Sequence, residues 1–423
     1  MAPVWHIEKM KVLQVSTTAQ LGGAGIAAYR LNQGLRSMGV DSWMLVNKKK
    51  QPDDFIISPT GKLDKIAARL NPYLERIPGR FSRQNLDRVS PSWSPGGVVS
   101  RIKAQSPDIV NLHWVNDGFL RIESLPAIPQ PVVWTLHDMW AFSGGEHYVG
   151  ESTRYIEGYS AENRPASETG LDVNRWIWRR KKKSWSAIDR MVIATPSKWL
   201  AACAQQSDLF RNLRVEVLPN GVDHERFHPL EHVIARRILG IPEDKKLVLF
   251  VEGSWNTDKR KGFHLLAQAL EKLEHAVVPD NYQLVVLGKS SGANTFSMKT
   301  RYLGKLHDEI SMALVYAAAD VFVAPSIEEN LANTVLESLS CGTPVVAFNI
   351  GGMPDMIDHR KNGYLAPGFD PEALARGIQW VVEDEKRWKE LSEQARATVV
   401  QSFTLQKSAS RYMALYNELL QAS

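Results

Sequence analysis

The sequence contains little cysteine and no long hydrophobic run. Cys203 and Cys341 are the two cysteines among 423 residues, too few for a disulfide framework or a cysteine-rich metal site. The longest apolar stretch, residues 312–327, is interrupted by Asp320 and Pro325 and is shorter than the roughly 20 residues that a membrane span needs. We therefore expect a cytoplasmic protein that is at most peripheral on the cytoplasmic face of a membrane.

Other features are missing as well. Residues 1–15 have no apolar segment ahead of their charges, so we expect no secretory signal. No sequence period of about 20 to 50 residues recurs, which excludes solenoids and propellers. The chain has no zinc-finger or RNA-recognition motif, and we expect no nucleic-acid partner.

The composition is globular, with 44% hydrophobic and 23% charged residues. A chain of 423 residues fits two or three domains of ordinary size. Lysine and arginine exceed aspartate and glutamate by 51 − 46 = 5, and the isoelectric point is about 9.0. This basic balance suits an anionic ligand or an anionic membrane surface.

The hydrophobic pattern predicts two successive arrays of strands and helices. A short strand over residues 11–17 is followed by a glycine-rich turn and an amphipathic helix, which is the start of a parallel α/β sheet. Pro219, Asn220 and Gly221 interrupt the pattern, and it restarts with a strand over residues 245–253. We expect two doubly wound, Rossmann-like domains over 1–218 and 219–402, and a helix over 403–423 that returns to the first domain.

Two apolar strands of the first array end in histidines. His113 and His137 stand where residues 107–114 and 130–138 leave the predicted sheet. Ligands of doubly wound sheets bind at the carboxyl ends of the strands, so both side chains would face one crevice. A purely structural role is the alternative, and Asp138 either fixes the tautomer of His137 or caps the next element.

An acidic pair marks the second array. Glu329 lies just before a predicted helix over residues 332–341, and Glu337 lies eight positions later. At 100° per residue this separation is about 80° beyond two turns, so both carboxylates can address one elongated, polyhydroxylated ligand. Alternatively, Glu337 is an ordinary helix acid and Glu329 a capping carboxylate. The helix dipole makes the first amides an anion site suited to phosphate, formed by Leu331, Ala332, Asn333 and Thr334.

Two further segments have the character of anion-binding loops. Arg260 and Lys261 precede Gly262 and a predicted helix, where an anion belongs, although a solvated basic turn has the same sequence pattern. Gly22 and Gly23 follow the first strand. They form either a simple tight turn or a site where the backbone approaches a ligand closely.

Residues 325–357 resemble the donor-binding signature of glycosyltransferase family 4, whose members are retaining enzymes of the GT-B fold. The shared features are the Glu-x7-Glu pair, the Gly-x-Pro-Val-Val run and the Gly-Gly turn, in this order. The resemblance extends to the hinge segment 217–227, the basic loop 258–270, the glycine-rich loop 21–31 and the histidine segment 134–138. It covers about residues 10–420 and is weakest over 48–105 and 145–190, where cysteines common in relatives are missing.

The resemblance implies roles for residues of the second domain, which would bind the nucleotide sugar. Glu337 would hold the ribose hydroxyls, Glu329 the hydroxyls of the transferred sugar, and Lys261 the diphosphate. Many relatives carry an arginine five residues before the lysine, where this chain has Asn256; we expect Arg260 to replace it. Gly304 would let the backbone approach the nucleotide base.

In the first domain, which would bind the acceptor, the matching histidine is His137, expected near the reacting sugar. Gly22 and Gly23 would let the backbone approach the sugar diphosphate or the acceptor. The two domains of the GT-B fold face each other across a cleft. The assignment requires that the lysine turn and the helix start cradle one pyrophosphate, and that Glu337 is not sealed in an apolar interior.

The implied function is a retaining, metal-independent hexosyltransferase without a cofactor. It would move a sugar from a UDP- or GDP-type donor to a glycan or lipid-linked saccharide in cell-envelope polysaccharide synthesis. Lys261, Arg260 and the helix-start amides would stabilise the leaving phosphate, and no Asp-x-Asp metal motif occurs. The alternatives are a nucleotide-sugar epimerase or a phosphorylase of the same fold, and a catalytically silent sugar-nucleotide-binding or scaffold protein.

The run RWIWRRKKKSW at 175–185 also has two interpretations. Trp176 and Trp178, with five consecutive cations from Arg179 to Lys183, suit an anionic lipid surface such as one that carries a lipid-linked acceptor. Alternatively, the run is a solvated helix face whose tryptophans pack inward.

Overall fold

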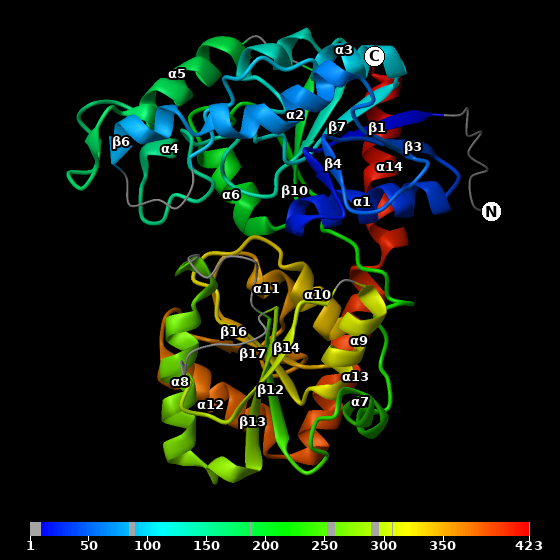
Figure 1. Cartoon of the computed structure of the whole chain (residues 1–423), viewed down its shortest axis with the longest axis vertical. Helices are drawn as coiled ribbons and strands as arrows, with labels where there is room; N and C mark the ends of the chain where they lie inside the picture. Colours follow the sequence, from blue (N-terminus) through cyan, green and yellow to red (C-terminus); the bar gives the residue numbers. More distant parts are fainter. Residues whose placement is uncertain are drawn as a thin grey trace. The chain divides into compact units, whose positions relative to one another are not determined.

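A computed structural model of the chain describes residues 10–83, 89–186, 188, 190–251, 259–288, 296–306 and 308–422. The chain divides into two compact units, each with its own parallel sheet (Figure 1). Unit 1 comprises residues 1–221 and 406–423, and unit 2 comprises residues 222–405.

Unit 1 is built on a seven-stranded sheet in which every neighbouring pair is parallel. Its order is β11 (Arg214–Val217), β10 (Met191–Thr195), β8 (Val132–Thr135), β7 (Ile109–Leu112), β1 (Lys11–Val15), β3 (Asp41–Leu45) and β5 (Ile56–Ile57). The helices are α1 (Gly22–Ser37), α2 (Lys62–Glu75), α3 (Val98–Gln105), α4 (Arg154–Glu157), α5 (Val173–Trp185), α6 (Lys198–Gln206) and α14 (Leu405–Gln421). Short segments are β2 (Thr18–Ala19) with β4 (Lys48–Lys49), β6 (Ser82–Arg83) with β9 (Thr169–Gly170), and the 3-10 turns Pro78–Phe81 and Ile122–Ala127.

Helices cover both faces of this sheet. Successive side chains of a strand point to opposite faces, so each strand contributes to two cores. In β1, Leu13 and Val15 belong to the core that includes α5 and α6, whereas Val12 belongs to the core formed with α1 and α14. The last helix of the chain, α14, shares this second core with β1, β7, β8 and β10 (Figure 1).

Unit 2 has a six-stranded sheet that is also parallel throughout. Its order is β14 (Thr300–Gly304), β13 (Tyr282–Leu287), β12 (Lys246–Val251), β15 (Val321–Ala324), β16 (Val345–Phe348) and β17 (Gly363–Ala366). The helices are α7 (His232–Leu239), α8 (Phe263–Ala276), α9 (Glu309–Ala318), α10 (Asn333–Ser340), α11 (Met353–Met356), α12 (Pro371–Val382) and α13 (Glu385–Ser402), with 3-10 turns at Lys259–Lys261 and Pro279–Asn281.

The strands of this second sheet alternate in the same way. In β12, Val248 and Phe250 pack with α8 and α12, while Leu247 and Leu249 pack with α9, α10 and α13. Helices on both faces of a parallel sheet define a doubly wound α/β unit, and the predicted fold class is confirmed in both units. None of the helices in the described ranges has the length and apolar content to cross a bilayer.

One local difference concerns the first glycine-rich segment. Helix α1 begins at Gly22 itself, so Gly22 and Gly23 form its first turn and do not precede it as a separate turn. Ser197 caps the start of α6, because its hydroxyl accepts a hydrogen bond from the Leu200 amide at 3.1 Å.

Candidate active site

Three loops of unit 2 meet at the carboxyl edge of its sheet. They follow β12, β15 and β16, which are neighbours or next neighbours in the sheet order. The first loop carries Lys261, the second Glu329 and the third Gly351. Since ligands of doubly wound sheets bind at this edge, it is the candidate donor site.

Lys261 and Glu329 form an ion pair across two of these loops. The lysine Nζ lies 2.5 Å from the glutamate Oε2, and the side chains are 42% and 11% exposed. Burial tends to raise the pKa of Glu329, but the charges of Lys261 and Arg260 and the bond to Lys261 outweigh it and hold the pKa below its ordinary value. The site therefore contains an ionised carboxylate beside two cations at neutral pH.

Glycines allow the loops to pack this closely. Gly262 has φ +66° at the start of α8, and a Cβ there would lie 1.7 Å from the Pro325 carbonyl oxygen. Gly351, at φ +51°, would place a Cβ 2.0 Å from the Glu329 carbonyl oxygen. The Ile327 amide also donates to the Arg260 carbonyl at 2.7 Å. Because a side chain at either glycine would separate the loops, both positions help to fix the Lys261–Glu329 geometry.

Helix α10 begins behind Glu329. Ala332 occupies its N-cap position and has no side-chain oxygen with which to cap the first amides, so the dipole end is suited to an anionic ligand. Leu331 is 6% exposed, and Asn333 is the first helical residue. The predicted anion site thus lies on the same loop as Glu329.

Glu337 lies deeper than the other predicted site residues. It is 5% exposed, and its Oε2 accepts a hydrogen bond from the Tyr316 hydroxyl at 3.1 Å. The carboxylate therefore has a polar partner, although Val335, Leu336 and Leu339 of the same helix belong to an apolar core. Its contact with a ribose stays a prediction.

Gly304 ends β14 at the same edge of the sheet. It has φ +71°, and a Cβ there would meet nothing within 4 Å. Its carbonyl accepts a hydrogen bond from the Gly288 amide at 2.7 Å. Open space above a glycine backbone suits close approach of a flat base. Asn256, the position of the arginine in relatives, lies outside the described residues.

In unit 1, Gly22 and Gly23 lie at the carboxyl end of β1. A Cβ at either would meet nothing within 4 Å, so there is room for a ligand beside both. Gly25 differs, because its Cβ would lie 2.5 Å from the Thr18 hydroxyl oxygen. Close packing therefore requires glycine at 25, a position that the sequence pattern did not single out.

His113 and His137, which follow β7 and β8, lie in contact with each other. Nδ1 of His113 lies 3.0 Å from Nε2 of His137, and Nε2 of His113 lies 2.8 Å from Oε1 of Gln14. Burial lowers the pKa of His137 to about 4, against the charge of Asp138, which raises it. Burial and the neighbouring His137 hold the pKa of His113 well below its ordinary value. Both rings are neutral at pH 7.

Asp138 caps the next turn and engages a histidine that the sequence did not point to. Its Oδ1 accepts the Trp140 amide at 3.0 Å, and its Oδ2 lies 2.7 Å from Nδ1 of His147. Nε2 of His147 in turn lies 2.8 Å from the Ser90 hydroxyl. Ser90 is 4% exposed, so these buried hydrogen bonds join the segment at Ser90 to the loop that follows β8. The adjacent Glu146 and His147 in the run SGGEHY were the only indication of this contact in the sequence.

The basic run in α5 is largely used for contacts within unit 1. Lys181 is fully buried and donates to the carbonyls of Trp140, Ser143 and Gly144, and burial holds its pKa well below the ordinary value. Arg180 pairs with Glu123 and Lys182 with Asp208. Trp178 packs against the core, while Trp176 is 41% exposed. These contacts favour the packed-helix interpretation of residues 175–185.

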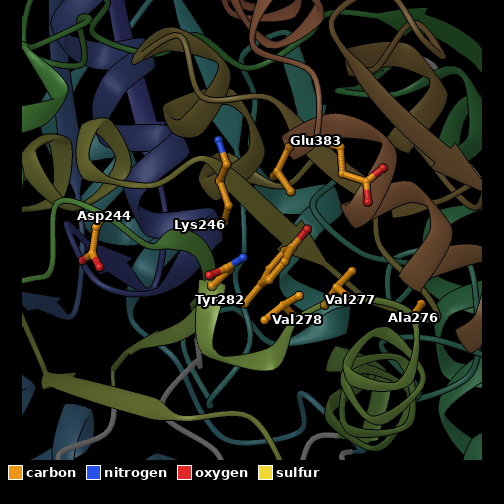
Figure 2. Close-up of a pocket in the computed structure, with 9 residues that line it drawn as sticks. Asp244, Lys246, Ala276, Val277, Val278, Tyr282 and Glu383 are labelled. Carbon is orange, nitrogen blue, oxygen red and sulfur yellow. The ribbon is translucent and has the colours of Figure 1, made fainter.

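A hollow of about 600 Å³ lies at the opposite edge of the unit 2 sheet (Figure 2). Lys246 and Tyr282, the first residues of β12 and β13, line it together with Val277, Val278 and Glu383. Because it lies at the amino ends of the strands, it is separate from the candidate donor site.

Comparison with known proteins assigns the chain to a family. Residues 21–226 match the family model described as Glycosyltransferase Family 4, and residues 234–398 match the model described as Glycosyl transferases group 1. The chain belongs to glycosyltransferase family 4. This agrees with the two doubly wound units and with the loop constellation at the sheet edge of unit 2.

Individual relatives cover parts of the chain. The D-inositol 3-phosphate glycosyltransferase of Xylanimonas cellulosilytica is 34% identical over 202 residues, which are 44% of this chain and 46% of that protein. The enzyme of the same name from Corynebacterium urealyticum is 29% identical over 323 residues, 68% and 69% of the two chains. For the first three relatives of this kind, the match spans only 40% to 52% of their length.

Solved structures show the same fold over nearly the whole chain. Sucrose-phosphate synthase from Thermosynechococcus elongatus has a TM-score of 0.68 at 20% identity, covering 98% of this chain and 100% of that one. Anabaena HepE in complex with UDP and glucose has a TM-score of 0.62 at 17% identity, covering 96% and 99%. The protein therefore has the GT-B fold.

Proposed function

We propose that the protein is a retaining glycosyltransferase that uses a UDP- or GDP-sugar. The acceptor in this proposal is a glycan or a lipid-linked saccharide of cell-envelope polysaccharide synthesis. The observation that carries the proposal is the Lys261–Glu329 pair at 2.5 Å, held against the start of α10 at the carboxyl edge of the sheet. HepE, of the same fold, is described with bound UDP-glucose, and WaaG as a glycosyltransferase of lipopolysaccharide biosynthesis.

In the proposed reaction, the bond between the anomeric carbon and the diphosphate oxygen breaks. A new bond to the acceptor oxygen forms on the same face of the sugar, and the departing phosphate takes the acceptor's proton. Negative charge grows on the phosphate during this step, so a fixed cation stabilises the transition state more than the ground state. A lysine ammonium carries three donors, and its bond to Glu329 leaves capacity for a diphosphate oxygen.

The other predicted residues take supporting roles in this proposal. Arg260 adds positive charge, and the backbone amides of Leu331, Ala332 and Asn333, at the start of α10, bind phosphate oxygens without a metal ion. Glu329 orients the sugar hydroxyls, and Glu337 holds the ribose. Neutral His137 suits a hydrogen bond to the sugar, since a charged ring would oppose positive charge developing at the anomeric carbon.

An epimerase, a phosphorylase and a silent binding protein remain the competing functions. The first test measures nucleotide release from a panel of UDP- and GDP-sugars, with and without saccharide acceptors. Under our proposal, Lys261→Ala lowers kcat/KM by about 10² to 10³, the range found when one oxyanion-stabilising donor is removed. Glu337→Gln raises the KM for the donor more than it lowers kcat.

The matched control is Lys259→Ala, two residues before Lys261 in the same basic segment Lys259–Lys261. Lys259 is exposed and takes no part in the proposed site. The kcat/KM of Lys259→Ala should therefore stay within about twofold of the wild-type value, as for the loss of a surface charge. Equal losses in the two variants would reduce the basic turn to a general electrostatic effect. Donor binding without turnover of any sugar would favour the silent protein.

A further inference from the structure

Helix α2 of unit 1 is oriented with its polar side chains toward the protein. Its buried residues are Ala68, Asn71 and Glu75. The Asn71 amide donates to the carbonyls of Pro95 and Gly118 at 3.1 and 2.9 Å. The buried Glu75 carboxylate accepts the amides of Ser92, Trp93 and Ser94 at 2.6 to 3.0 Å. Hydrogen bonds, and not apolar packing, therefore hold this helix on the unit.

The apolar side chains of α2 face solvent instead. Leu63 is 82% exposed, Ile66 53%, Leu70 54% and Tyr73 70%. At 100° per residue, these four positions and Leu74 fall within an arc of about 100°, a continuous stripe along the helix. Figure 1 shows α2 running across the near side of unit 1. Contiguous exposed apolar surface of this kind marks an interaction site.

Cations border this stripe on one side. On the same helical projection, Lys62, Lys65, Arg69 and Arg76 fall within an arc of about 60° beside the apolar one, and all four are exposed. The one exposed acid of the helix, Asp64, falls on the buried side, where it interacts with Arg101. The outward half of α2 is thus apolar and basic.

Two more exposed apolar side chains lie in and beside the turn that follows the helix. Phe81, in the 3-10 turn that follows, is 61% exposed, and its carbonyl accepts the amide of Leu171, which is 64% exposed. We call Leu63, Ile66, Leu70, Tyr73, Phe81 and Leu171, with the four bordering cations, the α2 surface. Aliphatic, aromatic and basic side chains on one helix face are the composition of helices that lie in the interface of a bilayer.

We propose that the α2 surface docks on the surface of an anionic phospholipid bilayer. The apolar stripe would enter the boundary between headgroups and acyl chains, while the flexible lysine and arginine side chains reach the lipid phosphates. A protein partner fits less well, because lysine is depleted in protein interfaces. The proposal does not depend on sugar transfer, since docking needs neither donor nor acceptor.

The test is flotation of the full-length protein with phosphatidylcholine vesicles, with and without phosphatidylglycerol. We expect binding that requires phosphatidylglycerol and falls with salt. Lys62→Ser, Lys65→Ser and Arg69→Ser together should weaken it by about a hundredfold, since each cation near the surface contributes about fivefold. Leu63→Ser, Ile66→Ser and Leu70→Ser together should weaken it at least about tenfold and leave the circular dichroism spectrum unchanged.

The matched control replaces three similarly exposed residues of unit 2, Ile234, Ile238 and Ile310, by serine; they are 49%, 65% and 75% exposed. This variant should bind vesicles like the wild type. The proposal is overturned if the wild-type protein does not float with anionic vesicles, or if the Leu63, Ile66 and Leu70 variant floats equally well. It is also overturned if those substitutions instead dissociate a dimer in sedimentation velocity while vesicle binding is absent.

Discussion

At the scale of single residues, the histidine pair of unit 1 couples stability to pH. The pKa of His137 is lowered to about 4 by burial, from 6.5, and burial together with His137 holds the pKa of His113 well below its ordinary value. Below about pH 6.5 the unfolded chain therefore binds protons that the folded chain does not, and the free energy of unfolding falls as the pH drops toward 4.

We expect the loss from His137 alone to be about 1 to 2 kcal/mol between about pH 7 and pH 5, with a further loss from His113. In a double variant, His113→Gln with His137→Gln, the pH dependence of urea unfolding should be flatter over this range. Glu146 acts in the opposite direction, because burial raises its pKa to about 7, but it is the same in both proteins and cancels in the comparison. Parallel curves for the two proteins would contradict the buried, neutral pair.

The sequence predicted the loop residues of the candidate donor site but not the buried contacts of unit 1. Lys261, Glu329 and the glycines beside them belong to strand, loop and helix signals that are local in sequence. The contact between His147 and Asp138 depends on a loop that folds back over nine positions, and the burial of Lys181 depends on carbonyls about 40 residues earlier. The sequence predicted either a lipid-facing or a solvated position for Lys181, because no local pattern encodes which carbonyls a lysine will reach.

At the scale of elements, the approach of the loops after β12 and β15 should be limited by Gly262. An alanine there would combine a positive φ with a Cβ 1.7 Å from the Pro325 carbonyl oxygen, so the loop after β15 has to move. We expect Gly262→Ala to lower the free energy of unfolding by about 2 to 4 kcal/mol and to lower donor affinity as the Lys261–Glu329 pair separates.

Gly240 is the control for the conformational part of this loss. It lies in the same unit at φ +62°, and its Cβ would have an ordinary 3.6 Å contact with Arg301. Gly240→Ala should therefore lose only the about 1 to 2 kcal/mol of left-handed strain, with donor affinity unchanged. If the two variants were equally stable in urea, close packing of the loops would not be the constraint at 262.

The orientation of α2 shows what element-level patterns leave undetermined. Helix α2 spans Lys62–Glu75 and carries apolar side chains at helical spacing. A helical periodicity identifies an apolar face, but the usual inference that this face is buried fails here, because Asn71 and Glu75 find backbone partners in residues 92–118. Those partners are distant in sequence, and only the folded unit reveals which side is outward.

At the scale of the whole molecule, the last helix of the chain, α14, packs on the sheet of unit 1. The Tyr416 hydroxyl accepts a hydrogen bond from the Asn111 side chain of β7 at 2.8 Å, and the Tyr412 hydroxyl lies 3.0 Å from that of Thr135 in β8. All of these groups are buried. The strands of unit 1 and a final helix returning to it were predictable from local apolar patterns, but no local pattern shows which side chains about 300 positions apart would pair.

Removing one hydroxyl should expose this dependence. Tyr416→Phe keeps the ring but leaves the buried Asn111 amide without this acceptor. We expect it to lower the free energy of unfolding by about 1 to 3 kcal/mol. Glu418→Gln is the control in the same helix, since it weakens an exposed pair with Arg214 that contributes at most about 1 kcal/mol. Hydrogen exchange followed by mass spectrometry should show faster exchange of β7 and β8 in Tyr416→Phe, and unchanged exchange of β12 and β13. We expect this difference because each unit has its own core and α14 packs in the core of unit 1. Uniformly faster exchange in both sheets would mean that the two units do not unfold independently.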